Sequence, residues 1–184
     1  PAGGAPREML ENVHEADWAR DGKTLYVAQF AGGKDRIVHY PGGKVLYESP
    51  GCVTYVRVSP RGDLIAFLDH PILGDIGGSV CVVDLAGKKK TLSGGWKGLQ
   101  GLAWPAGGDE VWFTGSRVSK GGGLGLFALS LSGRERPVYG PPGTLKITDI
   151  SRDGRRVLLW RGTPRAVMIG LAPGDSKERE LSWF

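Results

Sequence analysis

The side chains that could do chemistry in this chain are few and scattered. Asp69, His70 and Asp75 fall within one seven-residue stretch, and carboxylate and imidazole groups are suitable metal ligands. Three such residues on a Gly-rich loop, with no further His or Cys, are however more typical of a solvated loop. We therefore expect neither a metal ion nor another cofactor.

Other catalytic patterns are absent or incomplete. His14 and Asp17 are three residues apart on one expected strand, so their side chains should point to opposite faces and cannot pair as base and orienting group. No Gly-x-Ser-x-Gly elbow of a serine hydrolase occurs. Lys120 precedes three glycines, but a phosphate-binding loop needs Gly-Lys-Ser/Thr opening a helix, and here a strand follows. The sequence thus predicts a protein that is not an enzyme.

Composition limits the kinds of partner that the protein can have. The 184 residues are 40% hydrophobic, which excludes a disordered chain, and the formal net charge of +5 is spread along the sequence. Without a basic patch interleaved with aromatics, we expect no nucleic-acid partner. No run of 18 apolar residues and no signal peptide are present, so direct membrane insertion is not expected. Cys81 lies in the apolar run 79–83, where a free thiol acts as a small hydrophobe, and Cys52 is 29 residues away.

The elements that must position these residues repeat along the chain. The glycines of four turns, Gly22, Gly62, Gly108 and Gly154, are spaced 40, 46 and 46 residues apart, and each precedes an apolar run. A period of this length, with four strand-like runs per unit and no helical periodicity, is typical of a β-propeller. We predict an all-β fold with four four-stranded antiparallel blades.

The repeat also predicts the blade boundaries. Residues 1–12 would hold the outer strand of a preceding blade, and the blades would cover 13–51, 52–95, 96–143 and 144–184. The last blade would have strands at 145–150, 156–160, 166–171 and 177–183.

Both ends of the chain offer an outer strand, at 7–11 and at 178–183. Unpaired strand edges tend to be paired. We therefore expect a homodimer, in which two head-to-tail copies form an eight-blade ring and segment 7–11 reaches the last blade of the other copy. The alternative is a closed ring of four blades.

Two stretches resemble known propellers. The hairpin Val58-Ser59-Pro60-Arg61-Gly62 with its following strand resembles the repeat of TolB-like, WD40-like (PD40-type) propellers, although Arg61 replaces the aspartate of their Ser-Pro-Asp-Gly turn. The last blade, at 149–159 and 171–183, resembles the propeller region of bacterial serine/threonine kinases of the acidobacterial type. This resemblance implies a non-enzymatic sensor or protein-interaction module, and it is compatible with an extracytoplasmic location. No kinase motif occurs in the chain itself.

Function on propellers resides in loops. We expect one rim formed by residues 49–53, 70–78, 94–99, 116–123 and 140–144. Trp18 and Trp104 occupy equivalent positions and should pack between blades. Trp96, in a Gly-rich connection, is expected to be an exposed binding contact, with inter-blade packing as the alternative. The candidate binding residues on this rim are Trp96, Lys97, His70, Asp75, Arg117 and Lys120.

The partner could be a protein or a small ligand. The competing hypothesis is a lyase or hydrolase with a site in the central channel, or a propeller that gates a prolyl-oligopeptidase-like peptidase. A channel site requires polar side chains from the inner strands, and one equivalent set of positions there is apolar or small, which disfavours an enzyme: Ala16, Val56, Leu102 and Thr148.

Overall fold

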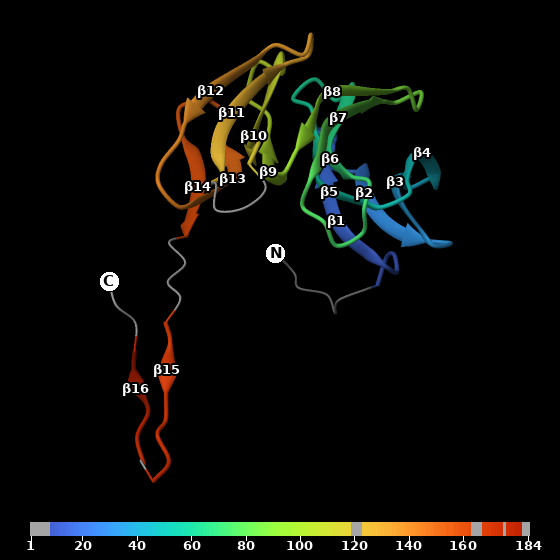
Figure 1. Ribbon diagram of the computed structural model, residues 1–184. Helices are drawn as coiled ribbons and strands as arrows, with labels where there is room; N and C mark the ends of the chain where they lie inside the picture. The colour runs from blue at the N-terminus through green and yellow to red at the C-terminus, as the bar shows by residue number, and fades with distance from the viewer. Residues whose placement is uncertain (1–7, 119–122, 163–166, 175, 182–184) are drawn as a thin grey trace, which may run out of the picture.

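Three blades are complete four-stranded antiparallel sheets. The computed structural model describes residues 8–118, 123–162, 167–174 and 176–181, and the strands follow the chain from the innermost to the outermost position in each blade (Figure 1). No helix occurs in these residues, and none of them forms an apolar helix able to cross a membrane. The strands are β1 (Val13–Trp18), β2 (Leu25–Ala31), β3 (Lys34–Tyr40) and β4 (Lys44–Ser49) in blade 1, β5 (Cys52–Val58), β6 (Leu64–His70), β7 (Gly78–Asp84) and β8 (Lys89–Trp96) in blade 2, and β9 (Gly98–Ala103), β10 (Glu110–Ser116), β11 (Gly125–Ser130) and β12 (Glu135–Tyr139) in blade 3.

Blade 4 is divided. Its inner strands β13 (Thr144–Ile150) and β14 (Val157–Gly162) pair with each other, whereas β15 (Ile169–Gly170) and β16 (Arg179–Glu180) form a separate two-stranded sheet that stands away from the body in Figure 1. The expectation of one four-stranded sheet here is therefore wrong. In the complete blades the outer strands supply core residues such as Ile37, Val82 and Leu92, but residues 167–171 and Leu181 are mostly exposed and enter no buried cluster.

Each inner strand has one irregularity in its pairing with the second strand of its blade. The register shifts between Val13 and Glu15 in β1, between Thr54 and Arg57 in β5, and between Ile147 and Asp149 in β13; β9 has the same feature opposite Phe113 and Thr114. A bulge adds a residue and so resets which face the following side chains occupy. This reset decides which residues face the channel.

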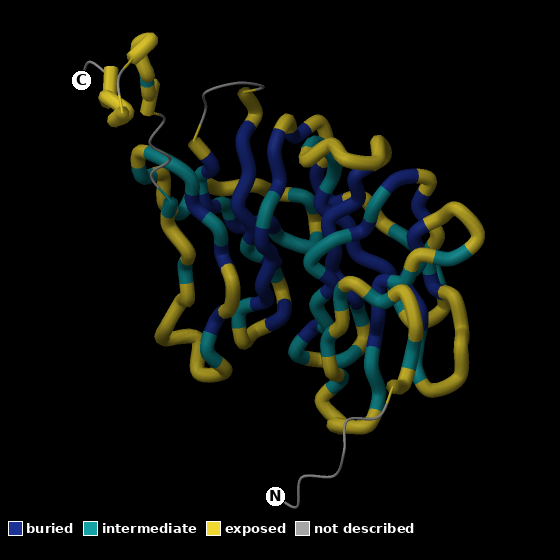
Figure 2. The backbone as a smooth tube through the Cα atoms, turned by 90° about the horizontal axis from the view of Figure 1, so that it is seen from below, coloured by how far each residue is buried: buried dark blue, intermediate teal, exposed yellow. Residues whose placement is uncertain are grey.

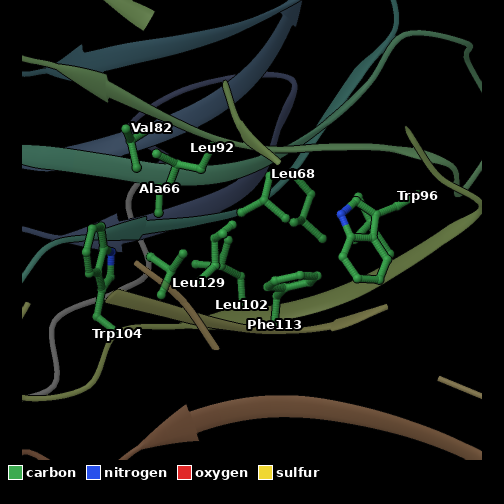
Figure 3. Close-up of a cluster of buried hydrophobic side chains, with 12 residues drawn as sticks. Ala66, Leu68, Val82, Leu92, Trp96, Leu102, Trp104, Phe113 and Leu129 are labelled. Atoms are coloured by element: carbon green, nitrogen blue, oxygen red, sulfur yellow. The ribbon is translucent and has the colours of Figure 1, made fainter. Parts of the chain in front are cut away.

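Three hydrophobic clusters hold the blades together. One lies between blades 1 and 2, one between blades 2 and 3, and one between blade 3 and β13–β14. Figure 3 shows the cluster between blades 2 and 3, where Leu68, Leu102 and Phe113 are fully buried. Trp104 packs in this cluster as expected, and the buried positions run through the middle of the blades in Figure 2.

No cluster in the described part of the chain joins blade 1 to blade 4, so the blades form an open arc. Trp18 is 55% exposed, contrary to its expected packing role, because no blade among the described residues packs on that side of blade 1. Residues 8–12 form no strand here, although Glu11 and Asn12 accept hydrogen bonds from Gln29 and Phe30; Arg7 lies outside the described residues.

Candidate functional site

The loops of blades 2 and 3 lie side by side at one rim, as expected from the sequence. The amide of Leu99 donates to the Ile76 carbonyl at 2.8 Å, and the amide of Lys97 donates to the Ser116 carbonyl at 2.9 Å. We call residues 71–77, 94–98 and 116–118 the rim loops. Backbone hydrogen bonds between loops of this kind make a braced surface.

His70 and Asp75 both shape the first rim loop. His70 ends β6, is buried, and has its Nδ1 3.0 Å from the Gly77 carbonyl oxygen and its Nε2 2.8 Å from the Thr54 hydroxyl. Asp75 is exposed, and its carboxylate accepts the Gly77 amide at 3.1 Å. His70 is therefore a brace inside the fold, whereas Asp75 is the one of the two that a partner can reach.

Trp96 ends β8 and is buried, not exposed as expected. Its ring meets Phe113 and Phe127 edge-on, each at 4.9 Å between centroids, and its Nε1 donates to the Ser93 hydroxyl at 2.8 Å. The ring fits because Gly115 has no side chain: a Cβ there would lie 2.8 Å from the indole. The alternative of inter-blade packing is the one observed, and Gly115 is the sequence signal that reveals it.

Arg117 covers Trp96. Its guanidinium lies over the indole ring, and it donates to both carboxylate oxygens of Glu135, at 2.8 and 3.0 Å, and to the Gly94 carbonyl at 2.7 Å. Burial raises the pKa of Glu135, but hydrogen bonds from Ser93 and Arg117 lower this pKa overall. Lys97 is exposed beside them, and Lys120 lies outside the described residues.

The rim loops display apolar side chains that the sequence analysis did not select. Ile72, Leu73, Ile76 and Val118 are each at least half exposed, and we call these four residues the rim patch. Ile76 rests on the braced backbone, since its Cδ1 lies 3.5 Å from the point where a Cβ of Gly98 would stand. The signal was the apolar run Pro71 to Leu73 inside a loop, where solvated loops carry polar residues. Exposed apolar side chains on neighbouring loops are typical of interaction surfaces.

The suspected metal ligands do not converge. Asp69 points into the interface with blade 1, where it bonds Lys89 Nζ at 2.5 Å, the Tyr47 hydroxyl at 2.7 Å and the Ser49 hydroxyl at 2.8 Å. His70 and Asp75 are engaged elsewhere, as described above. Among the described residues no three His, Cys, Asp or Glu side chains gather as a metal site.

The central channel is more polar than the sequence suggested. A cavity of about 1030 Å³ between the inner strands is lined by Asp17, Arg57 and Asp149, whereas Val56 and Leu102 are buried in the clusters between blades. The prediction that Val56 and Leu102 face the channel is wrong. The bulges in β5 and β9 shift by one residue which side chain points into the channel.

The channel carboxylates hold strands together. Asp17 accepts the amide of Val58 from blade 2 at 2.8 Å and the amide of Trp18 at 3.0 Å, and Asp149 accepts the amide of Ile150 at 2.8 Å. Burial raises the pKa of Asp17, and the lowering by the Val58 amide and by Arg57 does not offset it. Backbone amides thus occupy oxygens that a catalytic acid or base would use.

His14 does pair with a carboxylate, although not with Asp17. Its Nε2 lies 2.9 and 3.0 Å from the two oxygens of the buried Asp35, which also accepts the Val53 amide at 2.7 Å. Burial, and then Asp35, raise the pKa of the Cys52 thiol to about 11. This His, Asp and Cys group therefore has no thiolate nucleophile near neutral pH.

The comparisons with known proteins identify the fold. No protein-family profile and no curated protein sequence matches the chain. Among solved structures, TolB from Acinetobacter baumannii superposes with a TM-score of 0.61 at 17% identity, over 91% of this chain and 40% of TolB. A putative TolB from Agrobacterium tumefaciens gives 0.56 at 18% identity, over 85% and 64%.

Other neighbours with this fold differ in kind. Hydrazine synthase of Kuenenia stuttgartiensis superposes with a TM-score of 0.53 at 15% identity, over 77% of this chain and 47% of that one. The fold alone therefore does not separate enzymes from binding modules. The chain spans less than two thirds of each of these structures, and the resemblance of its last blade to kinase propeller regions stays a prediction. The sequence hypothesis about the repeat is confirmed: the chain has the fold of a TolB-like β-propeller.

Proposed function

We propose that this chain is a non-enzymatic interaction module that binds a protein partner on the rim of blades 2 and 3. The observation that carries the proposal is the rim patch, four exposed apolar side chains on hydrogen-bonded loops. Loops braced in this way lose little conformational entropy when a partner docks, which favours affinity. The exposed Lys97 and Asp75 flank the patch and would set orientation.

The base beneath the patch is rigid. Trp96, Phe113 and Phe127 form an aromatic cluster directly under the rim loops, and Arg117 closes it. A central apolar contact over a rigid base, with charged residues around it, is the anatomy of a protein interface. Trp96 and His70 then act from beneath, as supports for the surface and not as direct contacts.

The channel hypothesis of an enzyme is less well supported. A catalytic pair needs an acid and a base free to exchange protons with a substrate. Asp17 and Asp149 instead accept backbone amides, and Arg57 extends toward Glu15 at 3.9 Å. We therefore assign the channel residues to holding the inner strands.

A peptide selection tests the rim. Random peptides displayed on phage would be selected on the wild-type protein and then measured against Ile72→Ser/Val118→Ser. We expect the selected peptides to lose roughly tenfold or more in affinity. The matched control is Leu85→Ser, an exposed apolar residue in another turn, which should bind as wild type.

Two outcomes oppose the proposal. Peptides that bind Ile72→Ser/Val118→Ser as tightly as wild type would place the binding surface elsewhere. Peptides whose binding is lost in Asp149→Ala but kept in the rim variant would favour the channel.

A further inference from the structure

The outward face of blade 4 is built like a blade interface but is uncovered. Leu158 and Trp160, on β14, are 61% and 52% exposed. Their counterparts in blade 2, Ala66 and Leu68, are fully buried against blade 3. Large apolar side chains at positions that are interior in another repeat indicate a face meant to be covered.

Blade 1 has the complementary face, which in blade 2 packs against the preceding blade. In the register of its sheet, Leu25, Trp18 and Val45 lie on the side away from blade 2, where Trp18 and Val45 are exposed and Leu25 is half-buried, whereas Val27 on the same side is buried. The residue equivalent to Leu25 in blade 2 is Ile65, which is buried against the preceding blade. The chain therefore carries both halves of one more blade interface, at its two ends.

Asp149 of blade 4 repeats part of the hydrogen bonding of Asp17 in blade 1, whereas blades 2 and 3 have Arg57 and Ala103 at the equivalent position. In blade 1, one oxygen of Asp17 accepts its neighbour's amide and the other accepts the Val58 amide of the next blade. Asp149 occupies the equivalent position in blade 4 and likewise accepts the amide of Ile150. No following inner strand stands beside its other oxygen in the described part of the chain. The amide of Trp18, equivalent to that of Val58, would complete the pattern.

The charges at the two ends are complementary. The segment at 8–12 contains Glu8 and Glu11 and no basic residue, whereas β13 and β14 carry Lys146 and Arg161 and one acidic residue, Asp149. Lys146 lies on the uncovered face itself, with its Nζ 5.8 Å from the centroid of the Trp160 ring. Opposite charges at the edges of two apolar faces favour their association and fix their orientation.

We propose that a second copy of this chain covers these faces, with blade 1 of each copy packed on blade 4 of the other about a twofold axis. The four inner strands of the partner then lie between β13 and β1 around the channel, so the channel cavity is lined by residues of both copies. This surface is distinct from the rim patch, and the dimer goes beyond the proposed function.

Light scattering after gel filtration at micromolar concentration tests the proposal. The wild type should elute with twice the 19.7 kDa monomer mass. Leu158→Asp/Trp160→Asp should raise the dissociation constant roughly thirtyfold or more, because it places charges in an apolar interface. Leu85→Asp, at an exposed turn, is the control. Circular dichroism checks that each variant keeps its strands.

A disulfide trap tests the geometry. Leu25→Cys and Leu158→Cys chains, mixed and oxidised, should give a covalent heterodimer, because the equivalent positions Ile65 and Tyr26 share one buried cluster. Neither variant alone should crosslink to this extent. A monomeric wild type, a dimer insensitive to Leu158→Asp/Trp160→Asp, or equal crosslinking in the unmixed samples would each overturn the proposal.

Discussion

The guanidinium carbon of Arg117 lies 3.9 Å from the centroid of the Trp96 ring. The same guanidinium donates to both oxygens of Glu135, so one side chain links the end of β10 to the outer strand of blade 3 and to the last residue of β8. Both of these hydrogen bonds come from Nη2, while Nη1 donates to the Gly94 carbonyl, so the planar guanidinium stacks on the ring and donates in two directions at once. Blade 2 has an ion pair at a similar place with the two charges exchanged: Asp69 on β6 pairs with Lys89 at the start of β8.

Arg117→Ala should lower the free energy of unfolding by about 1 kcal/mol, because the lost contacts are partly exposed and each is worth a fraction of that. Arg117→Lys should recover only part of the loss, since a single ammonium cannot cover the indole face and donate to both Glu135 and the Gly94 carbonyl. Urea unfolding followed by tryptophan fluorescence measures this. Arg134→Ala is the control, and an equal effect of both alanine variants would contradict the assigned role.

Sequence reasoning succeeded where a signal repeats. The turn glycines gave the period, and apolar runs between them located the inner strands of all four units, including β13 and β14. It failed where a position depends on register. The bulges in β5 and β9 turned Val56 and Leu102 away from the channel, where the sequence placed them, and a single sequence shows no sign of a bulge.

Residue type likewise did not predict how far each tryptophan is buried. Trp18 and Trp104 occupy equivalent positions, yet Trp18 is exposed whereas Trp104 packs against blade 2, where its Nε1 donates to the Arg57 carbonyl. Trp96 was assigned to the surface because glycines surround it, although the decisive glycine, Gly115, lies on the neighbouring blade. Long-range packing therefore limits how much of a binding site can be assigned before the fold is known.

The Asp69 network should make stability depend on acidity. Burial raises the pKa of Asp69, but hydrogen bonds from Lys89, Tyr47 and Ser49 lower this pKa overall. A carboxylate with a lowered pKa contributes stability that is present above its unfolded pKa of about 3.9 and is lost as pH falls through the folded value. Asp69→Asn should therefore be less stable than wild type by about 3 kcal/mol at pH 7, since Lys89 loses its partner.

The difference between Asp69→Asn and wild type should shrink as pH falls below 4, when the wild-type carboxylate is protonated too. Guanidinium unfolding at pH 7, 5 and 3 measures it. Asp63→Asn, which alters an aspartate in the exposed turn of the same blade, should show a smaller change between these pH values. A difference that stays constant with pH would refute the assignment.

Gly101, at the irregularity of β9, should be far less replaceable than a turn glycine. It has a φ of +69°, and a Cβ there would lie 2.1 Å from the Ile147 carbonyl oxygen of blade 4. Gly22 has a φ of +64° with open space around it, so Gly22→Ala measures the backbone strain alone, about 1 kcal/mol. Gly101→Ala should cost at least about 2 kcal/mol more, because blades 3 and 4 must move apart.

Thermal unfolding of the two alanine variants makes the comparison of Gly101 with Gly22. Equal melting temperatures would contradict this prediction. They would mean that β13 can move away from β9 without loss of folding free energy.

Cys52 should be slow to react. With a pKa raised to about 11, only about 0.1% of the thiol is ionised at pH 8, against roughly a quarter for a free cysteine. Labelling with a disulfide reagent such as DTNB at pH 8 should thus be slow for the folded protein and fast in guanidinium. Asp35→Asn removes the negative charge of Asp35, which contributes to the raised pKa after burial, so it should speed labelling while the fold persists. Asp84→Asn, in a distant exposed turn, should not. If Asp35→Asn labels no faster than wild type, burial alone protects the thiol, and the carboxylate serves only to join His14 to the Val53 amide.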